Sequence, residues 1–279
     1  MLYLNIGCGS RFHPDWVNLD LKSNTPFIRA ADISRGIPYP DQTFSVVYHS
    51  HLLEHLQKQE AFSFIQDCYR VLKPGGVIRI AVPDLEQIAR SYLSVLEKSL
   101  EKQDDFQFDY DWMMLELYDQ AVREFSGGDM LRYLRKNLVP NLDFVYKRIG
   151  GEAKKIVNAT QTNLIIKKRN ETDLQKIIEI FRHLQSHAKE KLLRAILGSQ
   201  DYKALKVGRF RLSGEVHRWM YDRFSLQRLL EEVGFVQVTK QDADRSLISN
   251  WTSFNLDTEP DGSVYKPESL FMEAVKPPR

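Results

Sequence analysis

The chain has 279 residues, 43% of them hydrophobic and 27% charged, and its formal net charge is +2. This length allows a sizeable core, as one large domain or as a domain with a long insertion. The small net charge gives no overall field directed at nucleic acid. No apolar run approaches the roughly 18 residues of a membrane span. Cys8 and Cys68 are the only cysteines, so we expect no disulfide framework. The N-terminus has no basic segment followed by a long apolar run, and a cytoplasmic location is therefore expected.

The first 84 residues alternate between predicted strands and helices. Short apolar runs predict five strands, at residues 2–7, 16–21, 27–32, 44–50 and 77–83. Residues 59–72 carry apolar side chains at helical spacing, and the sequence KPGG at residues 73–76 is expected to break that helix. This alternation predicts an open α/β sheet covered on both faces.

Residues 85–213 show mainly helical periodicity, and their charge is segregated. Residues 97–129 contain 3 Lys or Arg and 10 Asp or Glu, a net charge of −7, whereas residues 150–211 contain 14 and 6, a net charge of +8. The first interpretation is two solvated helical faces that attract one another. The alternative is a basic wall facing an anionic substrate. We predict a helical insertion at residues 85–213 that acts as a lid or substrate platform.

The C-terminal part returns to an α/β pattern. A helix is expected from Ser225 to Gly234, with strands at residues 235–241 and 269–277. The turn-rich residues 255–269 are predicted to form a loop. The sequence therefore predicts seven strands in a core made of residues 1–84 and 214–279.

Candidate binding residues lie where the predicted strands end. Gly7 and Gly9 in NIGCGS lack a Cβ, so the backbone can come close to a ligand. The dinucleotide fingerprint G-x-G-x-x-G would need glycine where Phe12 stands. Asp20 ends the second strand, where a carboxylate can accept hydrogen bonds from both ribose hydroxyls. Asp32 ends the third and could hold an adenine amino group. For either acid alone, a surface or capping role is an equally good interpretation.

The ordered series of motifs resembles the class I S-adenosylmethionine-dependent methyltransferases, in particular the type 11-like methyltransferases that act on small molecules. The resemblance is carried by LNIGCGS, NLDL, AADI, IPYPDQTFSVVYHSHLLEHL and RVLKPGGVIRIAVPD, and it covers residues 2–84 and 225–276. It implies a Rossmann-like fold: a seven-stranded, mostly parallel sheet with helices on both faces and a large helical insertion. The implied cofactor is S-adenosyl-L-methionine, with S-adenosyl-L-homocysteine as product.

The resemblance also implies a set of cofactor contacts. In this family the glycine-rich turn passes under the methionine part, the acids after the second and third strands bind ribose and adenine, and the backbone after the fourth strand binds the amino acid end. Carried over by motif position, the cofactor-binding set is Asn5, Gly7, Cys8, Gly9, Asp20, Asp32, Ile33, Ser50 and His51. Asn5 departs from the family pattern, which usually has an acid at this position.

A second departure is the short connection between the first two strands. Only SRFHPDW stands there, in place of a full helix. GCGSRFHPDWVNLDL and HRWMYDRFSLQRLLEEVGF resemble a subgroup often associated with surface-polysaccharide genes. The missing helix leaves one side of the cofactor pocket without an expected cover.

The stretch His51-Leu-Leu-Glu-His55 also matches the H-x-x-E-H pattern of zinc peptidases. These residues are expected just past the fourth strand, not on a long helix, and no downstream acid stands out as a third ligand. We therefore predict no metal site. Glu54 and His55 are interpreted as hydrogen-bonded structural groups, with contact to substrate as the alternative.

Methyl transfer to a sugar hydroxyl requires a nucleophile in line with the methyl carbon and a base that removes its proton. Two histidines qualify as that base, His51 and His217. Asp222 could orient a base, and Tyr221 could bind the substrate. A hydrogen bond between domains would explain His217 equally well, and aromatic packing would explain Tyr221.

The resemblance favours O-methylation of a sugar or another small-molecule hydroxyl. The alternatives are methylation of another metabolite at nitrogen or carbon, and a scaffold protein that binds the cofactor without turnover. The expected partner is a small-molecule or glycan acceptor, which could be anionic. We expect no nucleic acid partner and no membrane span, and a homodimer is left open.

Overall fold

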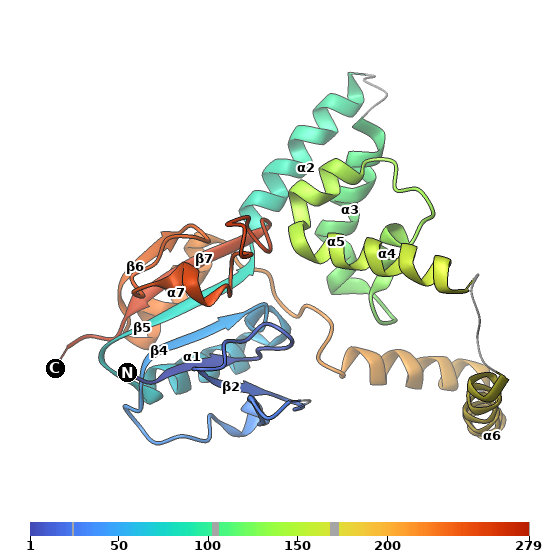
Figure 1. Cartoon of the computed structure of the whole chain (residues 1–279), viewed down its shortest axis with the longest axis horizontal. Helices are drawn as coiled ribbons and strands as arrows, with labels where there is room; N and C mark the ends of the chain where they lie inside the picture. The colour runs from blue at the N-terminus through green and yellow to red at the C-terminus, as the bar shows by residue number, and fades with distance from the viewer. Residues whose placement is uncertain (24, 102–105, 168–172, 279) are drawn as a thin grey trace.

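The computed structural model describes residues 1–23, 25–101, 106–167 and 173–278, with only the backbone described at residues 163–167 and 173–189. Its centre is a seven-stranded sheet with the order β3-β2-β1-β4-β5-β7-β6 (Figure 1). The strands are β1 Tyr3–Ile6, β2 Val17–Asp20, β3 Ile28–Ala30, β4 Phe44–Ser50, β5 Leu72–Pro83, β6 Val236–Gln241 and β7 Ser269–Val275. The first five pair in parallel, and β7 is antiparallel to β5 and β6. The predicted seven-stranded, mostly parallel sheet is confirmed.

Helices follow the strands of the core and fill the segment between β5 and β6. The α-helices are α1 Lys58–Val71, α2 Leu85–Leu100, α3 Gln107–Val122, α4 Gly128–Leu134, α5 Leu142–Lys167, α6 Asp173–Arg211 and α7 Arg223–Val233. Short 3-10 helices are η1 Ile33–Arg35, η2 Leu53–His55 and η4 Trp251–Phe254. In Figure 1, α2 to α5 stand beyond the carboxyl end of β5, and α6 extends away from the sheet. No helix among these described residues is long and apolar enough to cross a membrane.

One face of the sheet is covered by α1 and α7, which pack side by side. The cluster beneath them is mainly aliphatic and includes Leu4, Ile80 and Leu230, each fully buried. Helix α1 starts with a capping box, in which the Gln57 backbone N–H donates to Glu60 at 2.8 Å. The helix ends where β5 begins, so the predicted KPGG turn falls within the strand. Within β5 the two glycines of KPGG form backbone hydrogen bonds with Lys276: the Gly75 N–H donates to the Lys276 carbonyl, and the Lys276 N–H donates to the Gly76 carbonyl.

The opposite face is covered by residues 242–268, which are irregular apart from η4. We call them the C-terminal cover. Its Trp251 and Leu256 pack with Trp16 and Tyr48 in a largely aromatic cluster. Arg11, on the short β1–β2 connection, pairs with Glu259 of the cover at 3.1 Å and donates to a backbone carbonyl of it. The C-terminal cover therefore fills the place of the missing crossover helix.

A buried arginine fastens the C-terminal cover to the sheet. Arg79 of β5 is fully buried, and its guanidinium lies 2.8 Å from both the Asp257 and the Glu273 carboxylates. It also donates to the backbone carbonyl of Asp242 at 2.9 Å, and the Tyr48 hydroxyl donates to Asp257 at 2.6 Å. The remaining polar atoms of these side chains thus have partners, as a buried ion pair requires.

Helices α2 to α5 have a core of their own. It contains Trp112, Met113 and Val145, all fully buried, and a buried ion pair between Arg148 and Glu116. This segment leaves the core at Leu85, whose N–H donates to the Tyr221 carbonyl at 2.9 Å. The separate core of α2 to α5 agrees with the predicted division into a core and an insertion at residues 85–213. The division itself stays a prediction.

Candidate active site

The glycine-rich turn and Asp20 meet at the carboxyl ends of β1 and β2. Gly7 and Gly9 have φ angles of +66° and +53°, which favour glycine. A Cβ on Gly7 would lie 3.1 Å from the Leu52 side chain, whereas one on Gly9 would meet nothing within 4 Å. The Gly9 N–H donates to the Asp20 carboxylate at 2.8 Å. The turn and the acid therefore form one continuous, partly open surface.

Asn5 and Cys8 are both buried behind this surface. The Asn5 side-chain amide donates to the Arg11 carbonyl at 3.1 Å and to the Asn18 side chain at 3.3 Å. Its contacts thus hold the short connection in place. Burial, together with the Asp20 charge, raises the pKa of the Cys8 thiol to about 12. The thiol stays protonated at neutral pH and is a poor nucleophile.

The end of β3 carries Asp32 and Ile33. Asp32 caps η1 and accepts hydrogen bonds from the Ser34 hydroxyl and N–H at 2.7 and 3.1 Å, which lower its pKa. The Asp32 carboxylate is exposed, and Ile33 is half-buried against the main core cluster. Ile33 also lines a surface cavity of about 580 Å³ beside α1. The second carboxylate oxygen of Asp32 lies 3.5 Å from the Nε of Arg35, and both side chains are exposed.

The end of β4 brings His51 against Glu54 and Ser269. His51 has a φ of +51°, uncommon for a residue with a Cβ. Its Nδ1 lies 3.2 Å from a Glu54 carboxylate oxygen, and its Nε2 lies 2.8 Å from the Ser269 hydroxyl. Burial, then the Lys266 charge, lowers the His51 pKa. A neutral ring can accept the hydrogen bond of the Ser269 hydroxyl at Nε2 and present its Nδ1 proton toward Glu54, although that second contact is not a formed hydrogen bond.

Glu54 is 1% exposed and is surrounded by three imidazoles. Burial alone would raise the pKa of Glu54, but the close contact with His51 and the neighbouring imidazoles of His217 and His55 bring it well below the usual range. Its carboxylate oxygen lies 4.0 Å from the His55 Nε2. Glu54 is therefore an ionised carboxylate in a buried setting.

His217 lies between the core and the insertion. Its N–H donates to the Gln120 carbonyl of α3 at 3.0 Å, and its ring lies edge-on to His55 with centroids 4.8 Å apart. Burial lowers the His217 pKa to about 3, although the Glu54 charge opposes this shift. The ring is therefore neutral at physiological pH. Both predicted candidates for the base, His51 and His217, thus lie beside Glu54.

These groups line a cavity between the strand ends and the insertion, which we call the histidine cavity. Its volume is about 390 Å³. Acids outnumber the cations on its wall, which contains Glu54, Glu152, Glu215 and Glu268 against Arg123 and Lys266. Of the basic segment at residues 150–211, Glu152 and Ile156 line the cavity, and none of its described Lys or Arg side chains does. The alternative of a basic wall facing an anionic substrate stays a prediction.

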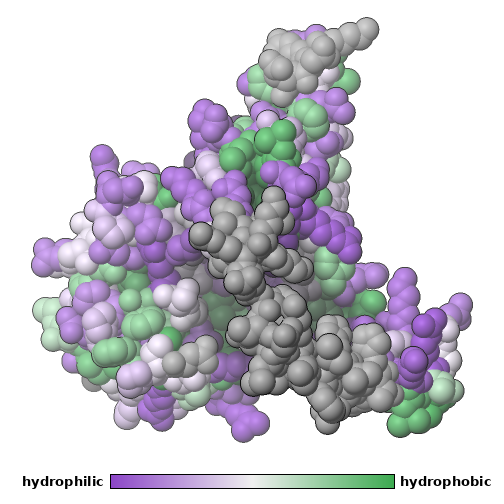
Figure 2. All heavy atoms as spheres, turned by 45° about the vertical axis from the view of Figure 1, so that its right-hand side comes forward, coloured by the Kyte–Doolittle hydropathy of each residue, from purple (hydrophilic) through white to green (hydrophobic). Residues whose placement is uncertain are grey.

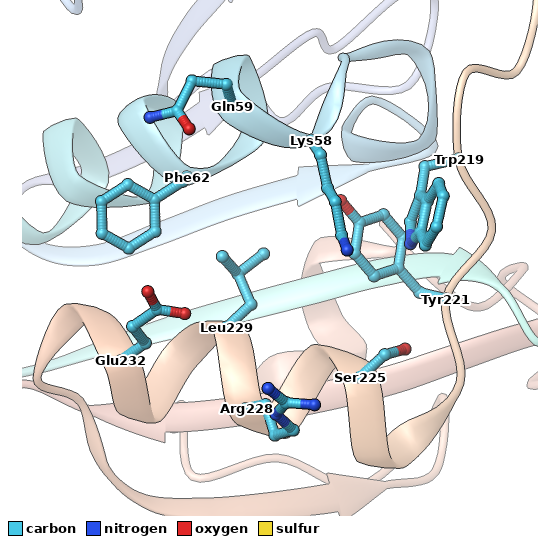
Figure 3. A pocket seen from close by; sticks show the side chains of 9 residues that line it. All are labelled: Lys58, Gln59, Phe62, Trp219, Tyr221, Ser225, Arg228, Leu229 and Glu232. Carbon is cyan, nitrogen blue, oxygen red and sulfur yellow. The ribbon is translucent and has the colours of Figure 1, made fainter.

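Tyr221 and Asp222 lie away from the histidine cavity. Tyr221 is 3% exposed and borders a groove between α1 and α7, beside Lys58 and Trp219 (Figure 3). Asp222 is the N-cap of α7, where its carboxylate accepts from the Ser225 N–H at 2.7 Å. Asp222 therefore caps a helix in place of orienting a base. The packing interpretation of Tyr221 agrees with its burial better than contact with a substrate in the histidine cavity does.

Several residues of the histidine cavity carry no local signal in the sequence. Lys266 pairs with Glu152 of α5 at 2.9 Å and so links the C-terminal cover to the insertion. Burial raises the pKa of Glu268 to about 8, against the opposing Lys266 charge. Arg123 pairs with Glu215 at 3.3 Å on the far wall. Lys266 and Glu268 fall in the loop predicted at residues 255–269, between two predicted strands, but no role was predicted for either.

The comparisons with known proteins agree with this arrangement. Residues 4–80 match the family model described as a methyltransferase domain. A protein of Mycolicibacterium smegmatis, described as "Probable S-adenosylmethionine-dependent methyltransferase", is 33% identical over 98 residues. That match covers 29% of this chain and 37% of the relative, so it spans little more than a third of the relative's length.

Two solved structures are similar over different shares of the chain. A SAM-dependent methyltransferase from Archaeoglobus fulgidus is 12% identical with a TM-score of 0.37, covering 98% of this chain and 85% of that one. One from Aquifex aeolicus is 16% identical with a TM-score of 0.25, covering 30% and 57%. The fold assignment rests on the strand order of this chain itself.

The match of residues 4–80 to a methyltransferase domain covers the glycine turn and Asp20. The relative that matches is described as S-adenosylmethionine-dependent. The strand order agrees with the fold that was expected for such a domain.

Proposed function

We propose that the protein transfers the methyl group of S-adenosylmethionine to a hydroxyl of a sugar or another small molecule bound in the histidine cavity. The supporting observation is the adjacency of two sites. Leu52 packs on Gly7 of the predicted cofactor surface, and its neighbours His51 and Glu54 line the cavity. A donor held on that surface and an acceptor in that cavity would lie on either side of one short loop.

The residues on the cofactor surface fit a nucleoside joined to an amino acid. The open space over Gly9 and the Asp20 carboxylate at the edge of β2 suit a ribose. Asp32 and Ile33 would hold adenine, and the backbone at Ser50 and His51 would hold the amino acid end. When bound, the cofactor supplies a methyl group on a positively charged sulfur. The open turn at Gly9 leaves the backbone accessible.

The chain offers two proton acceptors for the acceptor hydroxyl. His51 and His217 are both neutral, and the ionised Glu54 beside them would stabilise either as an imidazolium. The proton would leave the hydroxyl for an imidazole nitrogen while the oxygen forms its bond to the methyl carbon. The walls of the cavity would hold the hydroxyl in line with the methyl group.

The charges of the cavity narrow the acceptor class. Acidic side chains predominate, so a neutral acceptor rich in hydroxyls fits better than an anionic one. The volume of about 390 Å³ suits a small molecule or the terminal sugar of a glycan. The surface-polysaccharide setting is part of this proposal. Methylation at nitrogen or carbon, a non-catalytic scaffold and a homodimer are the remaining alternatives.

Calorimetric titration with S-adenosylhomocysteine tests the cofactor site. Asp20→Ala should weaken binding by about 100-fold, because it removes the carboxylate that would hold the ribose. Asp15→Ala is the matched control, since this exposed acid lies on the same short connection. Absence of binding to the folded wild-type protein would contradict the proposal.

Transfer assays with labelled methyl donor then separate the acceptor classes. Neutral sugars should accept the label, and His51→Ala or His217→Ala should slow its transfer while leaving S-adenosylhomocysteine binding intact. Label found on amines alone would replace the hydroxyl acceptor by a nitrogen acceptor. Tight cofactor binding without transfer to any acceptor would favour the scaffold.

A further inference from the structure

Three ligand-type side chains meet on the wall of the histidine cavity. One donor atom from each of Glu54, His55 and His217 can be chosen so that all three lie within 4.8 Å of one another. We propose that these three residues bind a divalent transition-metal ion, with Zn²⁺ as the best-matched ion. Two imidazoles and one carboxylate are a ligand set that zinc sites use when a further position is left for water or substrate.

The Glu54 carboxylate supplies an independent reason for a cation. Glu54 is 1% exposed, and neither of its oxygens has a fully formed hydrogen bond among the described residues. The buried His55 Nδ1 also lacks a hydrogen-bond partner there. Buried charged groups are normally paired or coordinate metals, because leaving them uncompensated is costly. A bound cation would satisfy both residues.

The charge of the surroundings agrees with a cation. Beyond Glu54, the cavity wall carries three acids, Glu152, Glu215 and Glu268, against Arg123 and Lys266. Glu152 and Glu215 have those two cations as partners. Glu54 has only imidazoles beside it, so the excess negative charge is concentrated at the proposed ligands.

The backbone holds the two ligand-bearing segments together. The N–H groups of Arg218 and Trp219 donate to the Glu54 carbonyl at 2.7 and 3.2 Å. The His217 N–H is fixed to Gln120 of α3. The backbone of η2 and of the segment before α7 is therefore held in place before any ion binds, and only side-chain rotations remain for forming the site.

Binding requires the side chains to move inward. Nitrogen and oxygen ligands lie about 2.0–2.2 Å from zinc, which places neighbouring ligand atoms roughly 3.3 Å apart in a tetrahedron. His55 is about a fifth exposed and can rotate into the cluster. His51 would keep its contact with Glu54 and orient the carboxylate from outside the coordination sphere, as outer-shell groups of metal sites do.

This site differs from the peptidase pattern that the sequence matches. In that pattern the two histidines of H-x-x-E-H bind zinc from one helix and the glutamate is the base. Here η2 is a single 3-10 turn, Glu54 becomes a ligand, and His51 does not. His217 is the third ligand, and it comes from a segment that the sequence could not place beside η2.

The metal site does not rest on the proposed methyl transfer. It does distinguish between the two predicted bases, because His217 as a ligand could not accept a proton. His51 would then remain as the base, and the fourth position of the metal would face the cavity that holds the acceptor.

The test uses the untagged full-length protein stripped with a chelator. Calorimetric titration with Zn²⁺ should give one site, and Co²⁺ should give the visible absorption of a low-symmetry nitrogen and oxygen site. His217→Ala and Glu54→Gln should each weaken Zn²⁺ binding by at least about tenfold. His13→Ala is the matched control, since His13 lies on the short β1–β2 connection outside the cavity, and it should bind Zn²⁺ like the wild type.

Binding of S-adenosylhomocysteine by each variant checks its fold separately. The proposal is overturned if the folded wild type shows no Zn²⁺ heat and no Co²⁺ band, or if His217→Ala binds Zn²⁺ as tightly as the wild type. Failure to bind S-adenosylhomocysteine alongside normal Zn²⁺ binding would count against the proposed function and leave the metal site standing.

Discussion

The two faces of the sheet are covered in different ways. Helices α1 and α7 cover one face through aliphatic side chains such as Ile65 and Leu230. The other is covered by irregular chain, held by aromatic rings and by the ion pairs of Arg79. A regular helix satisfies its own backbone, whereas irregular chain needs side chains to satisfy its carbonyls. Arg79 meets that need by donating to the Asp242 and Arg245 carbonyls.

The irregular face also reaches the histidine cavity, which no described residue of α1 or α7 lines. The same C-terminal cover that replaces the crossover helix continues into Lys266 and Glu268 on the wall of the histidine cavity. Substitutions on the irregular face should therefore affect stability and ligand binding together. In the view of Figure 2, hydrophilic residues predominate on the described surface, and apolar residues form smaller groups among them.

The largest effect is expected at Arg79. Arg79→Ala removes the cation that faces two buried carboxylates, Asp257 and Glu273, which should lower the free energy of unfolding by about 3–5 kcal/mol. Urea denaturation followed by circular dichroism measures this loss. Arg90→Ala, which removes an exposed pair with Glu86 on α2, should cost less than about 1 kcal/mol. Equal costs for the two variants would mean that the Arg79 network does not fasten the cover.

A pair of apolar substitutions compares the faces directly. Phe254→Ala removes a ring that packs on Trp16 and His13, with centroids 5.1 Å away, and Leu230→Ala opens a cavity under α7. Each should cost about 2–4 kcal/mol of stability. Only Phe254→Ala should also weaken S-adenosylhomocysteine binding, by roughly tenfold, because it loosens the short connection after Gly9. Calorimetric titration at a temperature where both variants are folded measures the affinity for S-adenosylhomocysteine. Equal affinities of the two variants would mean that the two faces of the sheet do not differ in their effect on ligand binding.

The pH dependence of stability sharpens the comparison at Glu268. The raised pKa of about 8 means that the folded protein resists ionising this acid. Ionising Glu268 therefore lowers the free energy of unfolding. This loss is absent below the ordinary glutamate pKa, grows as the pH rises, and is complete above about pH 8. Lys266, Glu116 and Glu152 are the charges that act on it.

Glu268→Gln removes this penalty. Relative to the wild type, the variant should gain on the order of 4 kcal/mol of stability between pH 5 and pH 9. Chemical denaturation at the two pH values measures the difference, with Glu124→Gln as an exposed control. A gain that is the same at both values would show that Glu268 ionises normally.

The smallest effect is expected on the helical face at Asp222. Asp222→Ala should destabilise the protein by about 1 kcal/mol through loss of the α7 cap, and S-adenosylhomocysteine affinity should not change. Asp222→Asn should restore most of the stability, since asparagine is also a good cap. A change in cofactor affinity without a loss of stability would return Asp222 to the candidate site.

Local patterns were sufficient to predict the sheet. The run FSVVYHS is β4 with the predicted bounds, because apolar residues face both covers. The third strand is shorter than predicted, at Ile28–Ala30, since Phe27 is exposed and Asp32 turns away to cap η1. The glycine turn and Asp20 were predictable for the same reason: both follow directly from a buried strand.

The histidine cavity was only partly predictable. His51, His55 and His217 were identified as candidates, but Glu152, Lys266 and Glu268 come from an insertion helix and a loop with no pattern that indicates chemistry. The contacts between Arg11 and the C-terminal cover are equally remote in sequence. Such contacts depend on how irregular chain folds back on the sheet, and periodicity carries no information about this.

The insertion leaves and rejoins the core at neighbouring points. Asp84 and Tyr221 form a β-bridge, so the chain returns beside the place where it left. The proposed roof of the cavity is thus joined to the sheet at one narrow junction, and the proposed donor-binding surface lies outside the joined segment. In the proposed enzyme, substitutions in the roof would change the preference for an acceptor and leave the binding of the methyl donor as it is.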